Sequence, residues 1–391
     1  MNQVGQIATK LFQGSTQIWV ITIALAVFSF LPIYSASSIT SHAMHVILCF
    51  GILFVTHRVP YRYYGPLSTI FVWLSIGLLV MALLTGRTIG GANASRWIYI
   101  LGFSFQPSAF AQVALLMFLS RRLAKFEGVW TMRYAFRRIL WPIFLICALV
   151  LPANFSTTAL IFLNAIILLT IGGFPLKHTG KIVGAGALCF TLFLLVAPMV
   201  MESTRIDTWR GRIESFFVGG DEDSNYQQTL AQTAIAQGGI TGQGPGGGLH
   251  KHFLPQNNSD FVYALIVEEY GLIGGSVILM MYIWLLLAAL RVAHRAKDRF
   301  GKLMAFSLAF SIVLQAMVNM AVAVGLFPVT GQTLPLISAG GTSIWMTCLA
   351  IGAILAVSRG HGDGELADAD IEDAMASDLE KLTGITRVEH A

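Results

Sequence analysis

Residues 66–86 read PLSTIFVWLSIGLLVMALLTG, a run of 21 residues without a charged side chain. As an α-helix the run would be about 31 Å long at ~1.5 Å per residue, which matches a hydrocarbon core about 30 Å thick. A helix that is apolar on every side is buried either in a large core or in lipid. Only 12% of the 391 residues are charged and 55% are hydrophobic, so lipid is the better solvent for this run.

Nine further apolar runs are long enough to cross the same thickness. They are 17–35, 43–59, 107–123, 138–155, 156–174, 180–200, 261–290, 303–326 and 340–357. The fifth and sixth spans are nearly continuous, and we divide them at Pro152-Ala153-Asn154, which favours a tight turn. The sequence therefore predicts an all-α integral membrane protein with about ten transmembrane helices.

The distribution of basic residues predicts the orientation. With ten spans, one set of loops contains sixteen Lys and Arg residues and the opposite set contains six. The positive-inside rule then places both termini in the cytoplasm. The expected domains are a polytopic membrane domain, 1–357, with a large periplasmic loop at 201–260, and an acidic cytoplasmic tail, 358–391. The basic residues form short clusters between apolar runs, which argues against nucleic-acid binding.

Two other patterns have simple interpretations. The four cysteines, Cys49, Cys147, Cys189 and Cys348, all lie in apolar runs without metal-ligand spacing, and we interpret them as packing residues. Residues 242–247, GQGPGG, match GxGxxG formally. No strand is expected before them, so we interpret them as a flexible glycine turn and expect no nucleotide.

Three acidic residues lie in or beside a predicted span, where carboxylates are costly and typical of functional sites. Asp260 precedes the eighth span, and Glu268 and Glu269 lie about 12–14 Å further along the helix. The alternative for Asp260 is a helix N-cap. The alternative for the two glutamates is a structural ion pair with an arginine or a polar contact to a neighbouring helix.

Other polar residues are expected at the same face of the membrane. Arg96-Trp97 lies between spans three and four, Gln106 opens span four, and Arg210 and Arg212 lie in the large loop. Asn319 and Ser338 flank the connection between spans nine and ten. Each has an ordinary structural interpretation alone, but together with Asp260 they indicate a site on the periplasmic side.

Three runs resemble the SEDS family, which contains FtsW, RodA and SpoVE. They are PQNNSDFVYALIVEEYGLIGG at 255–275, NMAVAVGLFPVTGQTLPLISAGGTS at 319–343, and GANASRWI at 91–98 followed by FQPS at 105–108. Their order and spacing agree with the family along nearly the whole chain except the tail. Within the family, the likeness is greater to FtsW, the division-type member, than to RodA.

The sequence also departs from the usual family pattern. Ala109 and Gln112 stand where the family usually has a glutamate and a lysine, and Asn258 stands where a histidine is frequent. A missing acid and a missing base leave the charge unchanged, as expected if the two residues pair with each other. We interpret the chain as a divergent branch.

The resemblance implies a peptidoglycan glycosyltransferase that polymerises lipid II at the outer face of the bacterial inner membrane, for septal wall synthesis in cell division. Asp260 would be the catalytic base or a ligand of a divalent cation, Mg²⁺ or Mn²⁺. Glu268 and Glu269 would have supporting structural roles. The residues expected to contact the substrate are Arg96, Gln106, Arg210, Arg212, Ser259, Asn319 and Ser338.

The resemblance also implies partners: undecaprenyl-pyrophosphate-linked glycan, a class B penicillin-binding protein that acts as transpeptidase, and other division proteins. Two alternatives stay open. A lipid II flippase would use the same cavity but would not need a base at the outer interface. A noncatalytic division scaffold would tolerate the loss of Asp260.

Overall fold

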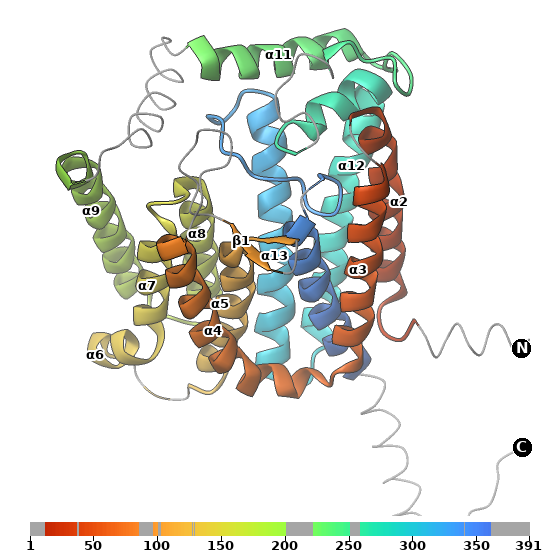
Figure 1. Cartoon of the computed structure of the whole chain (residues 1–391). Helices are drawn as coiled ribbons and strands as arrows, with labels where there is room; N and C mark the ends of the chain where they lie inside the picture. The colour runs from red at the N-terminus through yellow and green to blue at the C-terminus, as the bar shows by residue number, and fades with distance from the viewer. Residues whose placement is uncertain are drawn as a thin grey trace, which may run out of the picture.

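The computed structural model describes residues 12–36, 39–85, 97–100, 103–126, 128, 130–200, 222–250, 259–339 and 341–360. They form a bundle of long helices, which confirms the predicted all-α membrane class (Figure 1). The longer helices are α2 (Thr16–Ala36), α3 (Ile39–Arg58), α4 (Tyr64–Thr85), α5 (Pro107–Ala124), α7 (Trp141–Val150), α8 (Phe155–Ile171), α9 (Leu176–Val200), α11 (Glu222–Gly238), α12 (Val262–Arg295), α13 (Arg299–Ala323) and a last helix, Gly341–Gly360. The short elements are η1 (Tyr61–Tyr63), β1 (Ile98–Ile100), β2 (Phe103–Phe105), α6 (Met132–Ala135) and η2 (Phe136–Leu140).

Six described helices are long and apolar enough to cross a membrane. They are Thr16–Tyr34, Ile39–Arg58, Tyr61–Thr85, Val262–Arg295, Arg299–Ala323 and Gly341–Gly360. The four remaining predicted runs coincide with α5, with α6, η2 and α7 together, with α8 and with α9. The total of ten crossings stays a prediction.

The division between the fifth and sixth predicted runs is present in the structure. Helix α7 ends at Val150, and α8 begins at Phe155. Asn154 is the N-cap of α8, and its side chain accepts a hydrogen bond from the amide of Thr157 at 3.2 Å. A helix start with a satisfied cap is a true boundary, because the first amides of a helix have no partner inside it.

The centre of the bundle is formed by α5, α13 and the last helix. In α5, 14 of 18 residues are buried, so this helix is surrounded by protein on nearly every side. Small side chains such as Ala305, Ala309 and Ala316 are fully buried along α13. Small residues let helix backbones approach closely, which is the usual basis of helix packing in membranes.

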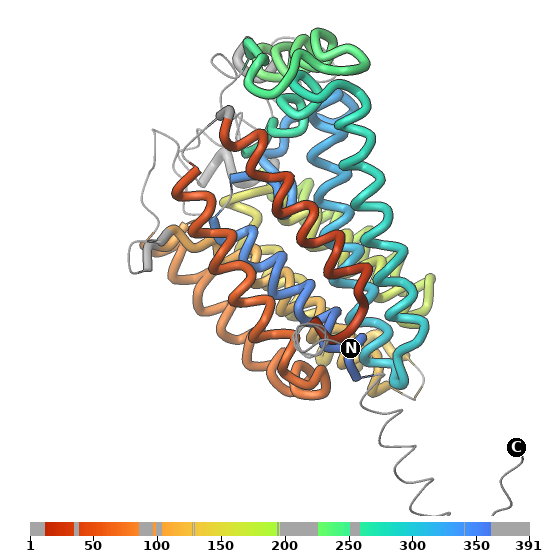
Figure 2. Tube along the Cα trace, turned by 90° about the vertical axis from the view of Figure 1, so that its right-hand side faces the viewer, coloured from red at the N-terminus to blue at the C-terminus, as the bar shows by residue number. Residues whose placement is uncertain are grey.

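The helices alternate between two ends of the bundle. We call the end at which α11 lies the α11 end, and the end at which α3, α5 and α12 terminate the basic end. Helix α11 crosses over the bundle in both views (Figures 1 and 2). A Cβ on Gly14 would lie 3.1 Å from the carbonyl oxygen of Leu355, so both described chain ends lie together near the basic end.

The β1–β2 hairpin and α11 lie outside the predicted spans. The strands β1 and β2 form an antiparallel hairpin in which Ile98 pairs with Phe105. This hairpin leads directly into α5. Helix α11 occupies part of the predicted loop 201–260, and the last helix extends to Gly360, three residues beyond the predicted domain boundary.

The prediction that all four cysteines are packing residues is wrong for two of them. Cys49 of α3 and Cys348 of the last helix form a disulfide, with their Cα atoms 5.6 Å apart. This separation is typical of disulfides. The two cysteines are 299 positions apart, and only the packing of α3 against the last helix brings them together. Cys147 and Cys189 are free thiols.

Candidate active site

Helix α12 is broken at Gly271, and the break shapes the α11 end. Gly271 has φ 70° and ψ −175°, a conformation that only glycine adopts readily. The break leaves the carbonyls of Glu268 and Glu269 without partners in their own helix. They accept hydrogen bonds from the amides of Gln243 at 3.0 Å and Gly244 at 2.9 Å.

The amides beyond the break are satisfied by the same loop. Leu272 donates to the carbonyl of Gly239 at 2.9 Å, and Ile273 donates to that of Ile240 at 3.2 Å. Irregular backbone at membrane depth is tolerated where protein satisfies it. The glycine-rich segment is therefore a turn, as predicted, but it is fixed to the break in α12 rather than flexible.

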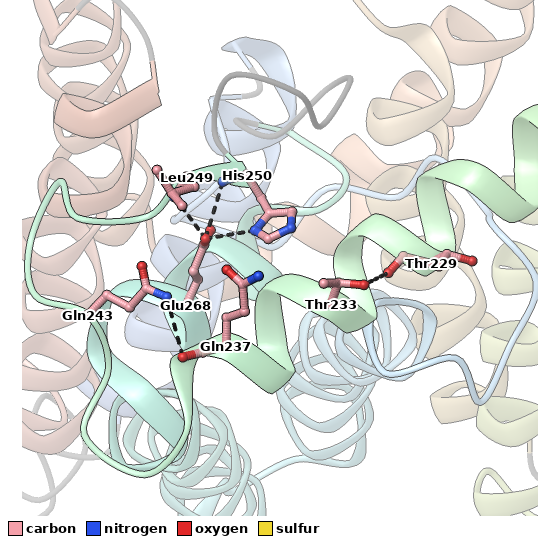
Figure 3. Close-up of polar contacts among 7 residues, drawn as sticks. All are labelled: Thr229, Thr233, Gln237, Gln243, Leu249, His250 and Glu268. Carbon is pink, nitrogen blue, oxygen red and sulfur yellow. Dashed lines mark hydrogen bonds and ion pairs between the residues drawn. The ribbon is translucent and has the colours of Figure 1, made fainter.

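Glu268 is fully buried and holds the chain that follows this turn (Figure 3). Its Oε1 accepts hydrogen bonds from the amides of Leu249 at 2.9 Å and His250 at 3.2 Å. The same oxygen lies 2.8 Å from Nδ1 of His250. The partner of this glutamate is thus a histidine with two backbone amides, where the sequence led us to expect an arginine or a neighbouring helix.

Asp260 lies in a turn directly before α12. The cap position of α12 is Phe261, one residue after Asp260. The Asp260 residue is partly exposed. Its Oδ2 lies beside Gly331, where a Cβ would be 3.4 Å from it.

Two polar side chains hold the Asp260 turn in place. Nδ2 of Asn319 donates to the carbonyl oxygens of Asp260 at 2.8 Å and Gln332 at 2.6 Å. Oγ of Ser338 donates to the carbonyl of Ser259 at 2.6 Å and accepts from the amide of Leu334 at 2.7 Å. We call Ser259, Asp260, Asn319 and Ser338 the aspartate clamp. Three residues predicted to contact the substrate therefore surround the predicted catalytic carboxylate.

The segment 328–339 forms one wall of the clamp without being helical. Gln332 donates to Oγ1 of Thr157 at 2.9 Å, and Gln315 donates to the carbonyl of Thr333 at 2.9 Å. The hydroxyl of Tyr282 donates to the carbonyl of Pro335. Leu336 has φ 65°, the one positive φ among the described non-glycine residues, and such strain persists where packing over-determines the backbone.

The other predicted substrate residues are placed differently. The amide of Gln106 donates to Oγ1 of Thr342 at 3.1 Å, at the start of the last helix, and its side chain donates to Ser108. Arg96, Arg210 and Arg212 lie outside the described residues. Sequence reasoning missed Thr157, His250 and Gln332. Gln332 stands within one of the quoted family-like runs, so its position was the available signal.

A small cavity lies where the family usually has its glutamate and lysine. It has a volume of about 30 Å³ and lies between α5, α13 and the last helix. Nε2 of Gln112 donates to Oγ of Ser311 at 2.5 Å. Ala109 lines the cavity, and its side chain is shorter than the glutamate that is usual in the family. Polar lining and this volume suit a single water molecule. Neutral hydrogen bonding thus takes the place of a charged pair.

The described residues contain no group of three or more His, Cys, Asp or Glu side chains that could hold a metal ion. Asp260 could supply one carboxylate oxygen. Mg²⁺ is frequently bound by one or two carboxylates together with substrate phosphates and water. The donor set therefore fits a cation that is held jointly with a phosphate-bearing ligand, rather than a site built from protein alone.

These features define a polytopic membrane protein with a fixed, partly exposed carboxylate at one end of its helical bundle. Residues 15–362 match the family model FTSW_RODA_SPOVE, described as cell cycle protein. The chain belongs to the FtsW/RodA/SpoVE family.

Two curated relatives cover nearly the whole chain. One, from Geobacter sulfurreducens and named "Probable peptidoglycan glycosyltransferase FtsW", is 32% identical over 361 residues, which are 87% of this chain and 94% of the relative. The other, "Stage V sporulation protein E" from Bacillus subtilis, is 29% identical over 358 residues, 87% of this chain and 95% of the relative.

Solved structures show the same fold. A chain from a study of "polymerization and crosslinking by a peptidoglycan synthase complex" aligns with a TM-score of 0.73 at 24% identity, covering 88% of this chain and 97% of that chain. RodA from Thermus thermophilus aligns with a TM-score of 0.65 at 22% identity, and the alignment covers 88% of this chain and 96% of the RodA chain. At these identities the likeness establishes the architecture alone.

Proposed function

We propose that this chain is a peptidoglycan glycosyltransferase that polymerises lipid II into glycan strands for septal wall synthesis. The observation that carries the proposal is the aspartate clamp, which holds the backbone at the partly exposed residue Asp260 at the α11 end of the bundle. The names of the curated relatives support the same reaction. Their FtsW assignment supports the division role.

The chemistry needs one well-placed base. The Asp260 carboxylate accepts the proton from the acceptor sugar hydroxyl as that oxygen forms a bond to the anomeric carbon of the donor. The bond from the anomeric carbon to the lipid pyrophosphate breaks, and the pyrophosphate leaves with the bonding electrons. This leaving group is already a stable anion and needs no general acid. Asn319 and Ser338 contribute by keeping the Asp260 backbone from moving.

The pyrophosphate needs positive charge. Arg96, Arg210 and Arg212 are the proposed donors of charge-assisted hydrogen bonds to its oxygens. A divalent cation held by Asp260 and the phosphates would supply further charge stabilisation when bound. The proposed contribution of Gln106 is to line the approach to this region, beside Thr342 of the last helix.

The proposed setting is the bacterial inner membrane, with α11 and Asp260 on the periplasmic side and both termini in the cytoplasm. The excess of basic residues at the opposite end supports this orientation. The proposed partner is a class B penicillin-binding protein, acting with other division proteins. A fold neighbour studied in a complex that couples polymerization and crosslinking supports a partner of this kind.

The test uses the full chain, purified with its cognate transpeptidase, whose crosslinking is blocked, and supplied with labelled lipid II and Mg²⁺. We expect Asp260→Asn to abolish glycan product while the complex stays intact, because the amide cannot accept the proton. Asp298→Asn is the matched control. Asp298 caps α13 through the amide of Gly301, and asparagine is an equally good cap.

Each outcome decides between the candidate functions. Glycan from both variants would remove Asp260 from catalysis. No glycan from the native chain, together with transfer of lipid II across a vesicle bilayer, would favour the flippase. Absence of both activities, with the transpeptidase stimulated equally by native chain and Asp260→Asn, would favour the scaffold.

A further inference from the structure

A cluster of arginines lies at the basic end, far from the aspartate clamp. Arg121 and Arg122 occupy the last turn of α5, and Arg138 lies in η2. Residues 121–138 contain six basic side chains and one acid, Glu127. This excess alone is expected from the positive-inside rule, so the contacts of each arginine must show whether the cluster does more.

Three other arginines at this end are bonded to protein. Arg121 donates to the carbonyl of Gly65 at 2.9 Å and to Oγ1 of Thr69 at 3.2 Å. Arg299 donates to the carbonyl of Gly172 at 2.8 Å, and Arg291 donates to Oε1 of Gln17 at 2.7 Å. These three side chains connect neighbouring segments, because each donates hydrogen bonds to acceptors in the protein.

Arg122 is different. Its guanidinium stacks over the ring of Phe118, with Cζ 4.9 Å from the centroid. Its Nε is shielded from solvent and has no hydrogen-bond acceptor among the described residues. Arg121 and Arg138 are both close enough to repel its charge, and among the described residues Tyr134 is the one that favours it. A half-buried guanidinium beside two like charges is costly unless an anion joins it.

The surroundings fit a lipid headgroup. Helix η2 is a π-helical turn, a geometry that recurs at functional sites, and it presents Arg138 to the exterior. Tyr134 and Phe136 are 43% and 56% exposed beside it. Exposed aromatics next to cations are typical of the membrane interface, and basic pockets between helices on the cytoplasmic side bind anionic headgroups.

We propose that Arg122 and Arg138 bind the phosphate of an anionic phospholipid, with Tyr134 and Phe136 against its glycerol and acyl region. Each guanidinium presents a planar fork of donors that matches a phosphodiester. The bound anion relieves the repulsion between the two arginines and fixes η2 against α5. This site is separate from the proposed polymerase site, and its test does not depend on glycan synthesis.

The experiment measures retained phosphatidylglycerol by native mass spectrometry of the full chain, after reconstitution in mixed phosphatidylglycerol and phosphatidylcholine. We expect Arg122→Gln/Arg138→Gln to weaken phosphatidylglycerol binding at least about tenfold, since charged hydrogen bonds are lost at both arginines. Lys177→Gln/Lys181→Gln is the matched control. It removes the same charge from two exposed residues at the start of α9.

Further arms separate the explanations. Arg122→Lys/Arg138→Lys keeps the positive charge but loses the planar guanidinium donors, and we expect an intermediate affinity for phosphatidylglycerol. If the double glutamine variant fails to fold, the double lysine variant takes its place in the test. Glu127→Gln should leave phosphatidylglycerol binding equal or tighter, because it removes the one acidic residue of the sequence 121–138. Equal loss in the Lys177/Lys181 control, loss in Glu127→Gln, or displacement of the lipid by millimolar inorganic phosphate would overturn the proposal.

Discussion

At the residue scale, the amide of Asn319 joins two segments that meet at the proposed base. It donates to the carbonyl of Asp260 before α12 and to that of Gln332 before the last helix. Asn319 is almost fully buried, and its bond to Gln332 is made away from water. The clamp therefore depends on this side chain.

We expect Asn319→Ala to cost about 1–3 kcal/mol of stability, because buried carbonyls lose a donor. Turnover should fall roughly 10- to 100-fold while the apparent KM changes little, since the base is displaced rather than the substrate site. Thermal unfolding and single-substrate kinetics measure the two effects. Asn164→Ala is the control, because among the described residues that buried amide bonds only to Leu160, within its own helix. Equal loss of turnover in both variants would contradict the positioning role.

Glu268 gives a second prediction at this scale. Glu268→Ala should destabilise the chain by about 3 kcal/mol or more, because the His250 side chain and two backbone amides lose a buried acceptor. Glu268→Gln keeps an acceptor oxygen and should cost only about 1 kcal/mol. Thermal unfolding in detergent separates the two. Equal destabilisation by both substitutions would mean that the charge, and not the acceptor, is what the loop requires.

The sequence predicted some of these residues and not their arrangement. Asp260 was identifiable because a carboxylate beside a span is rare, and the family-like run surrounds it. Asn319 and Ser338 were expected to contact the substrate, whereas the structure has them holding backbone carbonyls. His250 could not be chosen from sequence, because its partner Glu268 is brought to it by the break in α12.

At the element scale, α12 is two helices in one continuous segment. The apolar run predicts one span, and hydropathy contains no sign that Gly271 takes a positive φ. The break becomes favourable only because residues 239–244 satisfy the freed groups. Helix α11 was missed for a related reason. Its buried Ala231 and Ala234 are small, and its polar remainder resembles an ordinary loop.

Gly271→Ala tests the break. A Cβ there would lie 2.2 Å from the carbonyl oxygen of Ile240, and φ 70° is strained for alanine. We expect more than about 2 kcal/mol of destabilisation, measured by thermal unfolding in detergent. The control is Gly51→Ala in α3, where a Cβ would meet nothing within 4 Å and alanine favours the helix. A Gly271→Ala variant as stable as the control would show that α12 is straight.

At the scale of the whole molecule, lipid makes the spans predictable and the packing unpredictable. A run such as 66–86 must be a helix in a membrane, because its backbone groups have no other partners. Which spans become neighbours depends on side-chain shape. The Cys49–Cys348 disulfide joins helices that hydropathy treats as unrelated, and the β1–β2 hairpin is too short to leave a pattern.

The proposed orientation predicts a labelling pattern in intact cells. In a Cys189→Ser background, which removes the exposed free thiol, Thr233→Cys in α11 should react with a membrane-impermeant maleimide. Lys177→Cys, at the opposite end, should react only after the inner membrane is permeabilised. The reverse pattern would place the aspartate clamp in the cytoplasm, where the proposed polymerisation does not occur.

The break at Gly271 also bears on how the chain enters the membrane during synthesis. Leu272–Arg295 alone is 24 residues, about 36 Å as a helix, and crosses the hydrocarbon core without help. The preceding nine residues carry two glutamates and would be expelled from bare lipid. The translocation machinery thus needs to recognise only the segment Leu272–Arg295 as a transmembrane helix. Val262–Tyr270 can fold into place afterwards, once the glycine turn at residues 239–244 is there to bind it.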